Sequence, residues 1–180
     1  MSISELQKQT NTNIHEKANL IRESEINAAY YRLEMKQAEI AHALFHRIFE
    51  HESGWYNGHY HKNDSGEWQR ESYPIPVISV KGLCDIEIQF DKISVSTKLK
   101  RDAALAYSYK KFSEYEFEVY GVEDYLADFY HKGQTIQKMK ENICACDEAE
   151  IGFSFVFPFD IEGKQIFEFV KLLRHEGFYY

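Results

Sequence analysis

The chain has 180 residues and a formal net charge of −8, from 29 acidic and 21 basic side chains. Hydrophobic residues make up 44% of the chain and aromatic residues 16%, which is enough apolar surface for a packed core and excludes a chain that is disordered throughout. The negative charge argues against direct binding to nucleic acid or to an anionic membrane, because both need a basic protein surface. A basic protein partner is compatible with this charge.

Three cysteines, Cys84, Cys144 and Cys146, are too few and too irregularly spaced for a disulfide framework, which favours a reducing compartment. The N-terminal residues are polar and lack the apolar core of a signal peptide. No apolar run approaches the ~20 residues that a membrane span needs. We therefore expect a soluble, cytoplasmic protein.

Residues 1–52 are expected to form a helical N-terminal arm. From Ile14 to about Glu52 the chain has no Gly or Pro, and its apolar residues recur mostly at spacings of three and four, which predicts a long amphipathic helix. The apolar series is Ile14, Ala18, Ile21, Ala29, Leu33, Ile40, Leu44 and Ile48. Such a helix would be ~60 Å long, so it either breaks or packs in part on another subunit or a partner.

Residues 53–76 are expected to form an aromatic hairpin or connector. The turn residues Asn63–Gly66 lie between Tyr56–His61 and Glu67–Ser72, and these two flanking segments could pair as strands. Aromatic side chains on such a segment either anchor a partner or hold the segment to the domain. The candidates for partner contact are Trp55, Tyr60 and Trp68.

Residues 77–180 are expected to form the core of an α+β fold. Alternating apolar and polar residues, or continuous apolar runs, predict strands at Val77–Val80, Leu83–Phe90, Ile93–Lys98, Glu114–Tyr120 and Ile151–Phe157. Helices are expected at Lys100–Lys111, Val122–Tyr130, Thr135–Glu148 and from a cap at Asp160 to Gly177. Because these elements do not alternate as βαβ units, the predicted class is α+β, with a long N-terminal amphipathic helix followed by a mostly antiparallel sheet with packed helices.

The strand at mid-chain carries the main functional signal. Glu114, Glu116 and Glu118 alternate with apolar residues, which predicts one acidic, exposed face. The acidic stretch continues through Glu123, Asp124 and Asp128, and no Lys or Arg occurs between Ser113 and Tyr130. Carboxylates on one strand face lie ~6.8 Å apart, about half the linear charge density of a DNA strand. If the basic Lys98–Lys111 segment packed beside this strand, much of its charge would be neutralised internally.

A histidine cluster carries a second signal. His42 and His46 are one helical turn apart, and His59 and His61 would share one face of a strand. Four imidazoles could surround a zinc ion. The helix lacks the glutamate that follows the first histidine in metallopeptidases, because Ala43 occupies that position. No nucleophile motif or phosphate-binding loop is present.

These features lead to one main hypothesis and two alternatives. The main hypothesis is a small acidic, non-enzymatic interaction protein without a cofactor, which binds and inhibits or regulates a basic, nucleic-acid-handling protein such as a nuclease, a CRISPR effector or a toxin. The first alternative is a metal-dependent enzyme or zinc-stabilised domain that uses the histidine cluster. The second is a structural homo-oligomer held together by the N-terminal helix.

Overall fold

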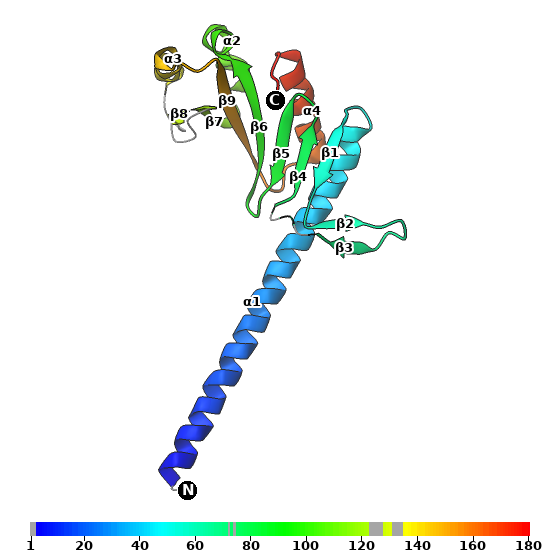
Figure 1. The fold of residues 1–180 in the computed structure, drawn as a ribbon, viewed down its shortest axis with the longest axis vertical. Coiled ribbons are helices and arrows are strands. Elements are labelled where there is room, and N and C mark those ends of the chain that lie inside the picture. Colours follow the sequence, from blue (N-terminus) through cyan, green and yellow to red (C-terminus); the bar gives the residue numbers. More distant parts are fainter. Residues whose placement is uncertain (1–2, 72, 74, 123–127, 131–134) are drawn as a thin grey trace. The chain divides into compact units, whose positions relative to one another are not determined.

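The computed structural model describes residues 3–71, 73, 75–122, 128–130 and 135–180, with the backbone alone for residues 3–13 and 128–130. The chain divides into two compact units, Met1–Lys36 and Gln37–Tyr180. The second unit is an α+β domain whose secondary-structure elements are shown in Figure 1. None of the helices in the described ranges is both long enough and apolar enough to cross a membrane.

The predicted long helix is confirmed as α1, Ile3–Phe49, which begins before the expected start at Ile14 and ends three residues before Glu52. In the first unit its large apolar side chains are exposed, among them Leu20 at 63% and Ile21 at 60%. The last turns of α1 belong to the second unit, because Gln37 begins that unit and is 1% exposed, with its side-chain amide donating to the Ile88 carbonyl oxygen at 2.7 Å. Oligomerisation through α1 stays a prediction.

A seven-stranded antiparallel sheet forms the centre of the domain, in the order β1-β4-β5-β6-β9-β7-β8. This arrangement confirms the predicted fold class. In sheet order the strands are β1 (Gly54–Asn57), β4 (Val77–Val80), β5 (Cys84–Ile88), β6 (Lys92–Lys100), β9 (Glu150–Pro158), β7 (Glu116–Gly121) and β8 (Asp128–Tyr130).

The predicted hairpin forms from shorter strands than expected, β2 (Tyr60–Lys62) and β3 (Trp68–Arg70). Its turn is closed by Asn63, whose side-chain oxygen accepts the backbone N–H groups of Ser65 at 3.0 Å and Glu67 at 2.9 Å. The residues at the start of the predicted hairpin instead form β1, which pairs with β4 of the main sheet.

One face of the sheet is covered by the last turns of α1 and by α4 (Gly163–His175), and the core between them is rich in aromatic rings. Rings from β9, from the 3-10 helix η1 (Tyr109–Phe112), from α4 and from the C-terminal residues contact one another there.

The predicted cap of the last helix at Asp160 is wrong. Glu162 is the N-cap, and it forms a capping box with Gln165, in which each side chain accepts the other residue's backbone N–H.

Two of the predicted helices contain other structure over part of their length. Lys100–Lys111 is divided into α2 (Arg101–Ala106) and η1, with Tyr107 extended between them. The rings of Tyr107, Tyr109 and Phe112 all contact the core cluster, and a continuous helix would point these three positions in different directions. The expected helix at Val122–Tyr130 is wrong at its end, which is the strand β8, while residues 123–127 lie outside the described part.

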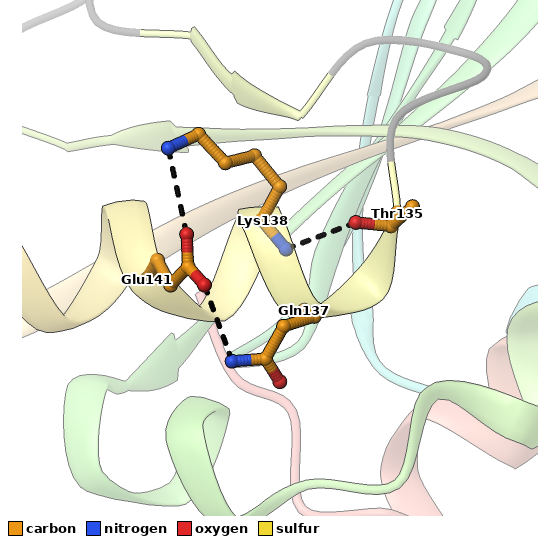
Figure 2. A network of polar contacts seen from close by, with 4 residues as sticks. All are labelled: Thr135, Gln137, Lys138 and Glu141. Atoms are coloured by element: carbon orange, nitrogen blue, oxygen red, sulfur yellow. Dashed lines mark hydrogen bonds and ion pairs between the residues drawn. The ribbon is translucent and has the colours of Figure 1, made fainter.

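The helix α3 (Ile136–Ala145) is shorter than the predicted Thr135–Glu148, because Cys146 is extended and ends it. Thr135 caps its start, with the side-chain oxygen accepting the backbone N–H of Lys138 at 3.2 Å (Figure 2). In the first turns Glu141 accepts hydrogen bonds from Gln137 and from the Lys138 ammonium, each at 3.4 Å.

Replacing Thr135 by alanine should lower the free energy of unfolding by about 1 kcal/mol, because the Thr135 hydroxyl accepts a backbone N–H at the helix start that has no partner within the helix. Urea unfolding followed by circular dichroism measures this change. The matched control is Thr135→Ser, which keeps the hydroxyl and should stay within a few tenths of a kcal/mol of the wild type. Equal stability of the alanine and serine variants would mean that this hydrogen bond does not stabilise the domain.

Candidate functional site

The second face of the sheet, which we call the open face, is polar. Directly paired residues of neighbouring antiparallel strands project to the same face, so the strand register assigns side chains to it without ambiguity. Two adjacent rows cross it from β1 to β7: Trp55, Ser79, Asp85, Ser96, Ser154 and Glu118 in the first, and Asn57, Val77, Glu87, Ser94, Val156 and Glu116 in the second. Most of these side chains are exposed or half-buried, and the intervening positions of β4, β5, β6, β9 and β7 are buried.

The charges in these two rows are all negative. Asp85 and Glu87 project from β5, and Glu116 and Glu118 project from β7, whereas neither row contains Lys or Arg. The two pairs are separated by β6 and β9, which places them about 14 Å apart at the usual strand spacing. Between them lies a floor of small side chains from β6 and β9. Within these two rows the open face therefore presents two acidic ridges with a shallow polar floor, and Lys92 and Lys98 of β6 project from the same face in the rows on either side.

Two of the predicted acidic residues lie in these ridges, since Glu116 and Glu118 are exposed while the residues between and after them, Phe117 and Val119, are buried. Glu114 precedes β7 and is exposed as well. Of the other predicted acids, Glu123 and Asp124 lie outside the described residues, and Asp128 is described by its backbone alone, in β8.

The basic segment Lys98–Lys111 has partners of its own. Lys98 lies 3.8 Å from the Glu150 carboxylate, and the Lys111 ammonium donates to Glu176. The hydrogen bond from Lys111 is the main cause that lowers the pKa of Glu176 below its ordinary value. These two cations are thus engaged with carboxylates that do not belong to the acidic ridges.

The three aromatic residues predicted to contact a partner lie in different environments. Trp55 is 55% exposed and begins the first row of the open face. Tyr60 is 5% exposed, within the domain. Trp68 is half-buried, with its ring 5.5 Å from the ring of His42 on α1 and with the Lys62 ammonium 5.0 Å from its centre. Trp55 is therefore the aromatic residue of this group that the fold presents beside the acidic ridges.

The predicted histidine cluster divides into separate parts. His42 and His46 form a pair on α1, with 3.2 Å between their Nε2 atoms. Partial burial, and then the charges of His46 and Lys62, lower the pKa of His42 below its ordinary value. The contact between His42 and Trp68 links α1 to the hairpin, so this pair has a clear role in packing.

The remaining two histidines point to other partners. His59 is 6% exposed, and its Nδ1 lies 2.5 Å from the Tyr73 carbonyl oxygen, which requires the proton to be on Nδ1. His61 Nδ1 lies 2.8 Å from the Glu71 carboxylate. Within the ranges that the structure describes, no three His, Cys, Asp or Glu side chains form a group that could hold a metal ion.

A groove of about 900 Å³ lies next to the open face, between the start of β7, the end of β9 and α4. Its charged lining residues are Glu114, Glu116, Glu162, Glu168 and Lys164. Its apolar lining is formed by Tyr115, Val156, Phe157, Pro158, Ile161, Phe169 and Leu172. The groove lies on the side of the sheet that α4 covers, and it meets the open face at Glu116 and Val156, which line the groove and also belong to the second row.

Asp85 and Glu87 were not predicted from the sequence as members of the candidate acidic site. The signal for their orientation was present, because they alternate with the apolar residues of β5 and must face away from the core. Their association with β7 depends on a strand order in which β6 and β9 separate the two pairs. A pattern within one strand cannot supply that order.

No protein-family model matches the chain, and no curated protein matches it. Among solved structures, a conserved hypothetical protein from Pyrococcus furiosus is similar to it, with a TM-score of 0.58 and 21% sequence identity over 82% of this chain and 96% of that one. At this identity the similarity concerns the fold alone.

Proposed function

We propose that this protein is a non-enzymatic binding protein whose open face binds the basic surface of a partner protein. The observation that carries the proposal is the pair of acidic ridges, Asp85 with Glu87 and Glu116 with Glu118, on one face and without a Lys or Arg in their two rows. Trp55 at the end of the first row adds an exposed aromatic side chain of the kind that anchors protein interfaces.

The proposed partner is a nucleic-acid-handling protein, whose activity is blocked or regulated by the complex. Proteins of this class neutralise phosphates with clustered Lys and Arg side chains. A surface with two ridges of carboxylates competes for these same side chains and needs no catalytic group. Such an interface is steered by long-range electrostatics, so that association is fast at low salt and slows as salt screens the charges.

Affinity capture from the native host, with three forms of the protein as bait, tests this proposal. We expect the wild type to retain a basic protein, and a Glu116→Lys, Glu118→Lys bait to retain at least about tenfold less, because reversed charges repel the partner's cations. The matched control is Asp64→Lys with Glu67→Lys, two exposed acids at the hairpin turn, which should capture as the wild type does. Equal capture by all three baits, with no dependence on salt, would refute the proposal.

A further inference from the structure

The groove beside the open face differs from the acidic ridges because it combines charge with an apolar floor. Tyr115, Ile161 and Leu172 are half-buried in it. Beneath them, Phe157 and Phe169 are at most 3% exposed, with ring centres 4.9 Å apart. The packed core therefore supports the floor of the groove. The exposed apolar surface of this floor lies between carboxylates.

The rim of the groove is acidic on both of its sides. Glu114 and Glu116 lie on the β7 side, and Glu162 and Glu168 lie on the α4 side, against the single lining cation Lys164. The Glu162 carboxylate accepts the backbone N–H of Gln165 in the capping box of α4, which holds it in position at the helix start. Glu168 lies 3.2 Å from the Lys171 ammonium, one turn further along the helix.

We propose that this groove binds an amphipathic basic segment of the partner protein, with an apolar side chain on the floor and Lys or Arg side chains at the rim. This inference rests on the proposed function and specifies the chemistry of the partner. The apolar side chain contacts Tyr115 and Leu172, and the flanking cations face Glu114 and Glu168.

Charge and shape both favour this occupant. An anionic ligand would meet four carboxylates, and a wholly polar cation would leave the apolar floor uncovered. The groove has the size of a ligand pocket, which is ~300–1,000 Å³, and it shares Glu116 and Val156 with the second row of the open face. A partner already held by the ridges can therefore extend a segment into the groove without leaving the surface.

Two synthetic peptides of equal length and charge test the inference by isothermal titration calorimetry with the full chain. One contains six lysines and six leucines in a helical amphipathic order, and in the other serines replace the leucines. We expect the leucine–lysine peptide to bind at least tenfold more tightly. Leu172→Gln should abolish this difference and leave the affinity for the serine–lysine peptide unchanged. The control Lys138→Gln, at an exposed position of α3 that is not among the groove residues, should retain the difference.

The outcomes separate this inference from the proposed function. If both peptides bind equally and both are weakened by Glu116→Lys with Glu118→Lys, the groove inference is wrong while the acidic ridges keep their role. If neither peptide binds, both proposals are wrong. Ile161→Gln provides a second test of the floor should Leu172→Gln fail to fold, since Ile161 precedes α4 and is half-buried.

Discussion

Replacing Phe155 by alanine is expected to destabilise the domain by about 3–5 kcal/mol, the usual cost of deleting a buried phenylalanine ring. Phe155 lies in β9 near the middle of the sheet and is 1% exposed. Its ring centre is 4.9 Å from that of Phe169, 5.2 Å from that of Phe112 and 5.4 Å from that of Phe117. The substitution removes contacts to α4, η1 and β7 together, and the surrounding strands cannot close the cavity completely.

Chemical unfolding at equilibrium measures this loss. Phe155→Leu keeps part of the volume and should lose less, which preserves the test if the alanine variant does not fold. Leu20→Ala, at a position 63% exposed in the first unit, serves as the control and should change the free energy of unfolding by less than about 0.5 kcal/mol. A loss below about 1 kcal/mol for Phe155→Ala would contradict the packing described for β9.

Reversing all four acids of the ridges should weaken binding to a basic partner more than a hundredfold, since like charges brought together across an interface cost several kcal/mol. The variant carries lysine at Asp85, Glu87, Glu116 and Glu118. The serine–lysine peptide and any protein captured from the host both serve as ligands, and titration at several salt concentrations measures the effect. The wild-type affinity should fall as salt rises, and the fourfold variant should show little or no attraction at any salt.

Two further variants separate the contributions of the ridges. Asp85→Lys with Glu87→Lys on β5 should weaken binding about as much as Glu116→Lys with Glu118→Lys on β7, because the two pairs lie on one face. Folding of each variant is checked by its thermal transition. The fourfold variant has four positive side chains where the wild type has four negative ones. The repulsion among these four side chains is therefore similar in the two proteins. If reversal of the β5 pair had no effect, the partner would not span the open face.

The acidic ridges and the aromatic core have the same physical origin. The ridges lie on β5 and β7. In both strands apolar residues occupy one face and polar residues the other, because successive side chains point in opposite directions. Phe117 and Val119 are held in the core by burial, and this fixes Glu116 and Glu118 outward. Destabilising the core would therefore disturb the presentation of the acids as well.

Local patterns in the sequence were sufficient for several features. The absence of Gly and Pro together with the helical spacing of apolar residues determined α1, and alternation determined that Glu116 and Glu118 face away from the core. The Asn63–Gly66 cluster located the hairpin turn. These features could be predicted because helices, strands and turns depend on residues that are close together in the chain.

Tertiary structure alone decided which of these residues lie together in the candidate site. The strand order β5-β6-β9-β7 places the acidic pair of β5 on the same face as the acidic pair of β7. Trp55 lies in β1, at the end of the first row, and not in the expected hairpin. The tertiary structure also directed His59 and His61 to separate partners, Tyr73 and Glu71. Strand order is set by which buried faces pack together across long separations in the chain. A local period of two residues shows which side chains share a face of one strand, but it does not show which strands become neighbours.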